Sequence, residues 1–141
     1  MSTLYTARAK AVGGRSGRVS TDDGLLDVGL ALPRALGGKE DATNPEQLFA
    51  AGYAACFENA VIHVARGLGA KIPDDAIVVD AVVGIGPNAT GGFALSVDLN
   101  VAIAGLAQDK AEEIVAAAHA TCPYSNAVKG NIDVGLNVTT S

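Results

Sequence analysis

The stretch that decides the fold is NPEQLFAAGYAACF, residues 44–57. It predicts the start of a long helix, because Asn44 suits the N-cap, Pro45 the first helical position and Gln47 the place of a capping-box partner. The helix is apolar nearly all round as far as Phe57, which is typical of a helix buried on every side. In so short a chain, a wrapped sheet together with a partner subunit is the simplest cover.

Strand patterns lie on both sides of this helix, and a second helix follows them. The expected elements, in chain order, are strands at Tyr5–Val12, Arg18–Thr21 and Leu26–Leu32, a loop at Pro33–Asp41, the long helix ending near Gly67–Gly69, strands at Ile77–Ile85 and Gly92–Ile103, a helix at Gln108–Thr121 stopped by Pro123, and a strand at Ile132–Thr139. Because strands and helices do not alternate regularly, this order predicts a single α+β domain over residues 1–141 with antiparallel sheet.

Composition narrows the class of protein. The 141 residues are 49% hydrophobic and only 18% charged, so we expect a large subunit interface and a homodimer. The net charge of −5, without a basic run, argues against a nucleic acid as the main partner. No stretch reaches about 18 uninterrupted apolar residues, and the first ten residues lack the apolar core of a signal peptide, so we expect a cytoplasmic protein with no membrane partner.

Two cysteines are the main candidates for chemistry. Cys56 lies in the middle of the apolar helix, and Cys122 lies at the end of the second helix, directly before Pro123. In the reducing cytosol a cysteine pair is more often catalytic or metal-binding than a static cross-link. An inert, buried thiol is the alternative interpretation of each.

A carboxylate in the first turn of the apolar helix is the second candidate. Glu46 either stabilises the helix dipole or points inward and holds an arginine. Arg15 can be that arginine, because it follows the Gly13-Gly14 turn, and Arg18 is the neighbour that could take its place.

Zinc binding is an alternative that the spacing leaves open. His63 shares a helix face with Cys56, and His119 shares one with Cys122, and two cysteines with two histidines can bind zinc. Cys56 and His63 are about 10 Å apart along the helix axis, too far to share one ion, so only His119 and Cys122 stay a candidate pair. No phosphate loop, dinucleotide fingerprint or serine elbow is present.

The long apolar segment at 44–57 resembles the signature helix of the organic hydroperoxide resistance proteins within the OsmC-like superfamily. CPYS at 122–125, GNIDV at 130–134 and GGR at 13–15 resemble further segments of that family. The likeness covers essentially the whole chain. It departs at Glu58-Asn59, where many members have small or apolar residues.

This resemblance implies antiparallel sheets wrapped around a long buried central helix in an intertwined homodimer. It further implies a cysteine-based peroxidase, without a cofactor, that reduces alkyl and fatty-acid hydroperoxides in defence against oxidative stress. The family's peroxidatic cysteine matches Cys56, its resolving cysteine matches Cys122, and its arginine and glutamate match Arg15 and Glu46. A dithiol such as a lipoylated protein is the implied reductant of the resulting disulfide.

Apolar side chains around the cysteines suit a greasy hydroperoxide better than hydrogen peroxide. The expected substrate-binding residues are Phe49, Tyr53, Phe57 and Tyr124. Two alternatives stay open beside the peroxidase: a zinc-binding structural module, and a redox sensor or small-ligand binder that forms the same disulfide without turnover.

Overall fold

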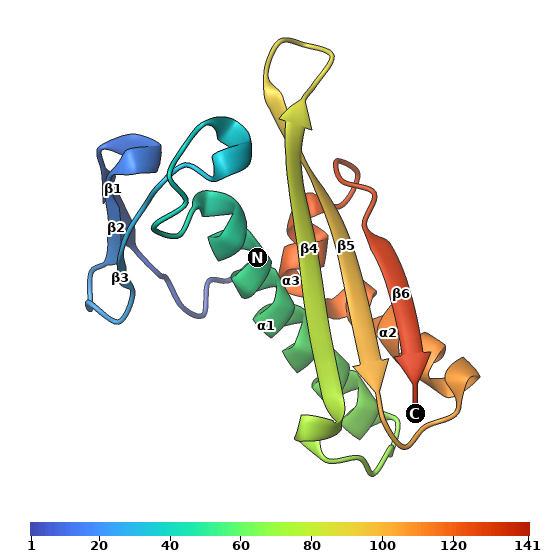
Figure 1. Ribbon diagram of the computed structural model, residues 1–141. Coiled ribbons are helices and arrows are strands. Elements are labelled where there is room, and N and C mark those ends of the chain that lie inside the picture. The colour runs from blue at the N-terminus through green and yellow to red at the C-terminus, as the bar shows by residue number, and fades with distance from the viewer. The chain divides into compact units, whose positions relative to one another are not determined.

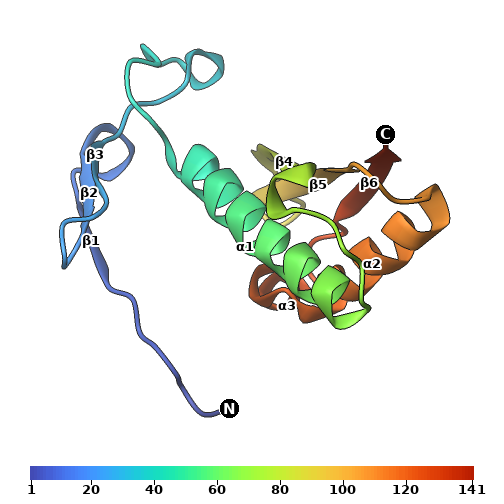
Figure 2. The same cartoon turned by 90° about the horizontal axis from the view of Figure 1, so that it is seen from below.

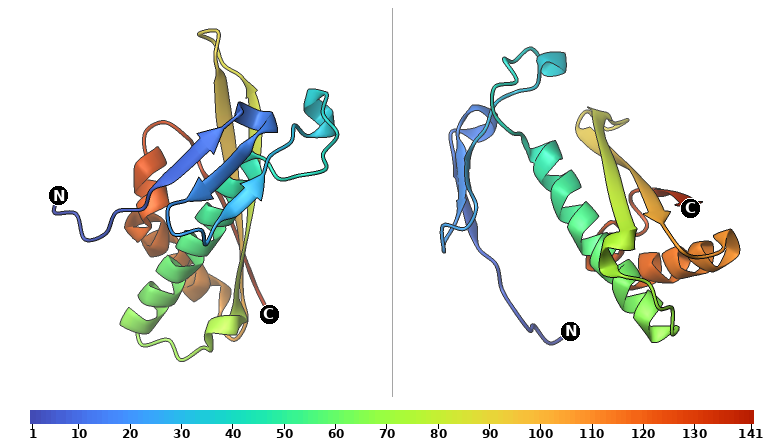
Figure 3. Two further views of the ribbon diagram at one scale, coloured as in Figure 1. Left: turned by 90° about the vertical axis from the view of Figure 1, so that its left-hand side faces the viewer. Right: turned by 60° about the horizontal axis from the view of Figure 1, so that its bottom comes forward.

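The computed structural model describes all residues from 1 to 141, which form two structural units. The first unit, residues 1–48, is built on a three-stranded antiparallel sheet (Figure 1). Its strands are β1 (Ala9–Val12), β2 (Arg18–Thr21) and β3 (Asp27–Gly29), which lie side by side in that order (Figure 3). The link from β1 to β2 requires glycine, because Gly13 has a φ of 84° and Gly14 a φ of 61°. This turn carries Arg15.

The long helix α1 (Pro45–Gly67) begins at the end of this unit and continues into the second. Asn44 is its N-cap as predicted, because the Gln47 backbone N–H donates to Asn44 Oδ1 at 2.8 Å. The Gln47 side chain accepts a hydrogen bond from Thr43 Oγ1 at 2.7 Å. In a capping box the Gln47 side chain would accept from the backbone N–H of Asn44. Here it accepts from the side chain of Thr43, the residue before the N-cap.

The second unit, residues 49–141, packs helices on one face of a three-stranded sheet (Figure 2). The sheet order is β4 (Ile77–Pro87), β5 (Phe93–Ile103) and β6 (Gly135–Thr140), and the helices are α1, α2 (Gln108–Thr121) and α3 (Pro123–Val128). Alternate residues of β5, from Val97 to Ile103, are buried against α1 and α2, as the period of two requires. The α+β architecture predicted from the sequence is confirmed.

One strand runs in a direction that the sequence pattern does not indicate. β6 pairs with β5 in parallel, whereas β4 and β5 form the expected antiparallel hairpin. The prediction of purely antiparallel sheet is therefore wrong for β6. The reason is that α2 and α3 carry the chain back along the sheet, so β6 enters it in the same direction as β5, as a helical crossover requires.

Helix α1 buries one stripe of its surface within the chain. By length and composition alone it could cross a membrane, but its buried residues belong to the core of the second unit. They recur at helical spacing: Tyr53, Phe57, Ala60, Val61 and Ala65. Ala51 and Ala55 are exposed, so a single chain does not bury α1 on every side as the apolar pattern predicts.

Candidate active site

The two cysteines meet in the second unit. Cys56 lies in the middle of α1, Cys122 lies at the corner between α2 and α3, and their Sγ atoms are 3.7 Å apart, with the Cys122 thiol donating. Both are free thiols. Cys122 is fully buried and Cys56 is half-buried, so a small molecule reaches Cys56 first.

The corner that holds Cys122 follows from the residue after it. Pro123 has no N–H to continue α2, but its fixed φ suits the first position of the new helix α3. The Cys122 N–H still donates to the carbonyl of Ala118 at 2.8 Å. Asn126 Nδ2 donates to the carbonyls of Ala120 and Cys122 at 3.1 and 3.2 Å, which ties the end of α2 to the start of α3.

The surroundings of Cys56 disfavour its thiolate. Burial raises the pKa of the Cys56 thiol, the backbone N–H of Tyr124 lowers it by donating to the sulfur, and the neighbouring Cys122 raises it again. None of these groups carries a positive charge. Because the thiolate is the nucleophile, a reactive Cys56 needs a cation from elsewhere.

An aromatic cluster lies beside the thiol pair. The ring centroid of Tyr53 lies 6.1 Å from that of Phe49, 5.6 Å from that of Tyr124 and 6.4 Å from that of Phe57. Tyr53 and Phe57 are fully buried, Phe49 is half-buried, and Tyr124 is exposed. Gly52 gives Tyr124 its place against α1, because a Cβ there would lie 2.7 Å from Tyr124 Oη.

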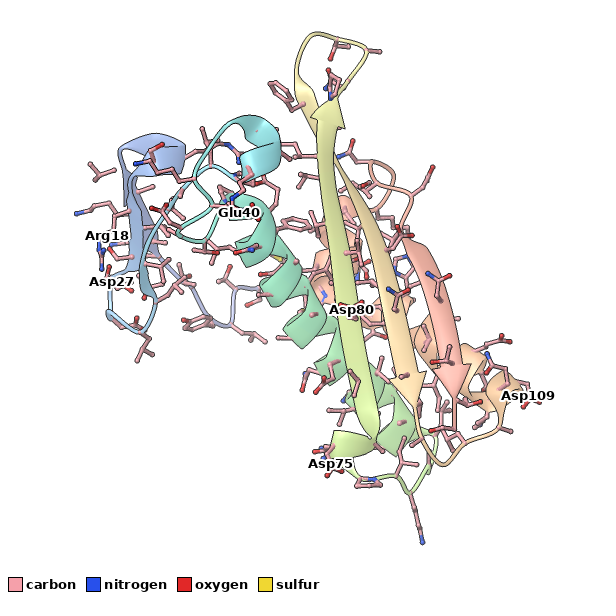
Figure 4. All side chains as sticks on the ribbon, in the orientation of Figure 1. Arg18, Asp27, Glu40, Asp75, Asp80 and Asp109 are labelled. Atoms are coloured by element: carbon pink, nitrogen blue, oxygen red, sulfur yellow. The ribbon has the colours of Figure 1, made fainter.

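The predicted arginine and glutamate meet in the first unit. Arg15 Nη1 and Nη2 donate to Glu46 Oε2 and Oε1 at 2.8 and 2.6 Å, a bidentate pair. This pair holds the pKa of the Glu46 carboxyl below its ordinary value, against the opposing effect of burial. Arg18 instead donates from Nε to Asp27 Oδ1 at 2.7 Å, between the neighbouring strands β2 and β3 (Figure 4). Of the two candidate arginines, the structure pairs Arg15 with Glu46.

Neither histidine belongs to a cluster of three or more possible metal ligands. His63 is exposed on α1, and no group of three or more histidine, cysteine, aspartate or glutamate side chains could hold a metal ion. His119 Nδ1 lies 2.9 Å from Ser125 Oγ, which in turn lies 2.7 Å from Tyr53 Oη. The pair His119 and Cys122 that the spacing left open therefore has no third histidine, cysteine, aspartate or glutamate ligand beside it.

Sequence reasoning missed Ser125 and Asn126. The signal that could have found them is the proline at the first position of a new helix. Ser125 is three residues after Cys122, one helical turn, so the two side chains point to the same side.

The chain is similar to known proteins along nearly its whole length. A family model described as OsmC-like protein matches residues 38–137. The organic hydroperoxide resistance protein of Xanthomonas axonopodis pv. citri is 50% identical over 136 residues, 96% of this chain and 94% of the relative. The organic hydroperoxide resistance protein OhrB of Bacillus subtilis is 45% identical over 135 residues, 96% of this chain and 98% of the relative.

A solved structure agrees with these matches. The crystal structure of an organic hydroperoxide resistance protein OsmC from Legionella pneumophila has a TM-score of 0.93 and 53% sequence identity, and the match covers 98% of this chain and 99% of that one. The similarity therefore includes both structural units and the segments that carry the two cysteines.

Proposed function

The chain belongs to the OsmC-like protein family, and from that premise we propose that it is a thiol-dependent peroxidase that reduces organic hydroperoxides to alcohols. Its relatives named organic hydroperoxide resistance protein support a role in resistance to these compounds and in defence against oxidative stress. The observation that carries the proposal is the distance of 3.7 Å between two free thiols, one half-buried and one fully buried.

In the first step the Cys56 thiolate attacks an oxygen of the hydroperoxide. The new S–O bond forms as the O–O bond breaks, so Cys56 becomes a sulfenic acid and the alkoxide takes up a proton to leave as the alcohol. Cys56 suits this role because it is the more accessible sulfur and accepts the Tyr124 N–H.

In the second step Cys122 attacks the sulfur of the sulfenic acid. The S–O bond breaks, a disulfide forms, and the hydroxide leaves as water with the proton that Cys122 gives up. Cys122 suits this role because it is close to Cys56 and has no exposure of its own to peroxide. An external dithiol then restores both thiols by exchange, and the family resemblance favours a lipoylated protein as its source.

We assign the missing positive charge to Arg15. The bidentate pair with Glu46 uses two of its five N–H donors, so three stay available for a thiolate or a peroxide oxygen. A guanidinium keeps its charge even beside apolar groups, and Glu46 fixes its orientation. The assignment is supported by the match to the family's arginine and glutamate.

The alkyl part of the substrate is assigned to the aromatic cluster. Phe49 and Tyr124 offer the accessible aromatic surface, and the buried rings of Tyr53 and Phe57 form the wall behind it. This surface is apolar, which favours an organic hydroperoxide over hydrogen peroxide.

A homodimer in the cytoplasm completes the proposal. The first unit buries only Leu30 and Asn44, and it exposes large apolar side chains such as Leu4, Tyr5 and Val12. Apolar surface of this extent marks an interaction site, and a second copy of the chain is the partner that the family resemblance implies. A pair of cysteines with a proposed catalytic role fits the reducing cytoplasm, where such pairs are more often catalytic than structural.

The test is the reaction of reduced protein with cumene hydroperoxide, followed by peroxide loss and by intact mass. The wild type should consume one equivalent and lose two thiols. Cys122→Ser should consume peroxide but stop at an oxidised Cys56, and Cys56→Ser should consume none, because a hydroxyl is far less nucleophilic than a thiolate. Consumption of one equivalent by Cys56→Ser would show that the roles are assigned wrongly.

Turnover with dihydrolipoamide separates the enzyme from the redox sensor. We expect repeated consumption of cumene hydroperoxide, and slower consumption of hydrogen peroxide at equal concentration. A protein that forms the disulfide once and is not reduced again by the dithiol would support the sensor.

A further inference from the structure

A hydrogen-bond chain joins the three helices that surround the thiol pair. Ser125 Oγ on α3 lies 2.7 Å from Tyr53 Oη on α1 and 2.9 Å from His119 Nδ1 on α2. Tyr53 is 0% exposed and Ser125 3% exposed, so water cannot easily replace these bonds. A buried hydrogen bond of this kind is costly to break, because the polar group left behind loses its partner.

Ser125 anchors the first turn of α3. This helix has six residues, and Ser125 is its only buried one. The rest of α3 is held by Tyr124, which packs against Gly52, by Val128, which packs against the core, and by the hydrogen bonds of Asn126. The two hydrogen bonds of Ser125 therefore fix the turn that directly follows Cys122.

Two members of the hydrogen-bond chain flank Cys122 in the sequence. His119 lies one helical turn before Cys122, and Ser125 lies one turn after it, so both sides of the corner are tied to the same hydroxyl. A serine hydroxyl has one hydrogen but accepts two bonds, so at least one of the two partners donates to it. Both bonds can therefore be satisfied at once.

We propose that Tyr53, Ser125 and His119 are positioning residues for disulfide formation, which hold the Cys122 thiol against Cys56. This inference rests on the proposed function. In the step concerned, the distance between the Sγ atoms falls from 3.7 Å to about 2.0 Å. Meanwhile the S–O bond of the sulfenic acid breaks, and water leaves with the proton from Cys122.

Position matters here because the sulfenic acid has a second fate. Another hydroperoxide molecule can oxidise it to the sulfinic acid, which a dithiol does not reverse. The ratio of disulfide to sulfinic acid therefore measures how well Cys122 is placed. It does not depend on how fast the sulfenic acid forms.

The experiment compares this ratio in wild type and variants, by intact mass after oxidation with increasing cumene hydroperoxide. His119→Leu removes one of the two bonds and should lower the ratio about three- to tenfold, the range that the net contribution of one hydrogen bond spans. Ser125→Ala removes both bonds and should lower the ratio further than His119→Leu does. His119→Asn, whose amide can take the place of Nδ1, should restore most of the ratio. Thr121→Ala is the matched control, because its hydroxyl bonds only to the carbonyl of Ala117 on its own helix.

Two further measurements separate positioning from a general loss of structure. Circular dichroism checks that each variant is folded at the assay temperature. In the Cys122→Ser background, Ser125→Ala should change the rate of Cys56 oxidation by a smaller factor than it changes the ratio in the background with both cysteines, since the hydrogen-bond chain acts mainly on the second step. A larger loss there would contradict the inference.

Combining Tyr53→Phe with Ser125→Ala should lower the ratio no further than Ser125→Ala alone, because the two groups share one bond. An unchanged ratio in both Ser125→Ala and His119→Leu would overturn the inference and leave the proposed function standing. A wild type that consumes no hydroperoxide would instead remove the proposed function, and this inference with it.

Discussion

Replacing Gly52 by alanine should slow the oxidation of Cys56 and leave the stability of the fold nearly unchanged. A Cβ at this position would lie 2.7 Å from Tyr124 Oη and 3.2 Å from two carbons of its ring. An ordinary contact needs about 3.4 Å, so the ring must retreat by about 0.7 Å. Alanine inside a helix is favoured over glycine by about 0.5–1 kcal/mol, which offsets the cost of this shift.

The two effects therefore appear in different measurements. Tyr124 is 38% exposed and can move its ring at little cost, so the thermal midpoint should change by no more than about 3 °C. The same shift displaces the accessible aromatic surface beside Cys56, and a misplacement of this size costs about tenfold in rate. Stopped-flow oxidation by cumene hydroperoxide measures the rate, and calorimetry measures the midpoint.

Gly67→Ala is the matched control on the same helix, because a Cβ there meets nothing within 4 Å. It should leave the oxidation rate at the wild-type value. A Gly52→Ala protein that melts well below the wild type while oxidising at the wild-type rate would refute the reasoning.

Arg15→Ala should raise the pKa of Cys56 in a titration of thiol alkylation, and Arg15→Lys should rescue it only in part, because an ammonium cannot make the two-bond contact with Glu46. Arg18→Ala breaks only the pair with Asp27 and should leave that titration unchanged. The folded-state pKa of Glu46 is lowered, so the pair contributes stability above the pKa of the unfolded state and loses it as the pH falls through the folded value. Urea unfolding of wild type and Glu46→Gln should therefore differ by about 1 kcal/mol at pH 7, and the difference should shrink as the pH falls below the ordinary range of a glutamate; a difference that grows on acidification would contradict this sign. Light scattering should give twice the mass of the chain, and a stable folded monomer at micromolar concentration would exclude the dimer.

The features that the sequence predicted correctly depend on neighbouring residues. Asn44 and Pro45 mark the start of α1 by themselves, because an N-cap and a first-turn proline act within one turn. The end of α2 before Pro123 follows in the same way, and its bounds, Gln108–Thr121, agree with the prediction. Both elements are set within a few residues of their ends.

The features that the sequence analysis missed or left open depend on residues far apart in the sequence. The parallel pairing of β6 depends on the path of the chain over α2 and α3, which no alternating pattern encodes. Ser125 meets Tyr53 across 72 positions, so only the folded chain brings them together. The pairing of Arg15 with Glu46, 31 positions apart, was predicted only as one of two options, because the residues left Arg18 open and the family resemblance selected Arg15.

The separation of Cys56 and Cys122 along the chain, 66 positions, has a thermodynamic consequence. A disulfide between them would close a long loop in the unfolded polypeptide and reduce its chain entropy by the equivalent of about 4 kcal/mol. The oxidised molecule would then unfold less often than the reduced one, and proteases that act on unfolded chains would remove it more slowly. The redox state would therefore govern the lifetime of the protein: molecules with the disulfide would be degraded more slowly than molecules with two reduced thiols.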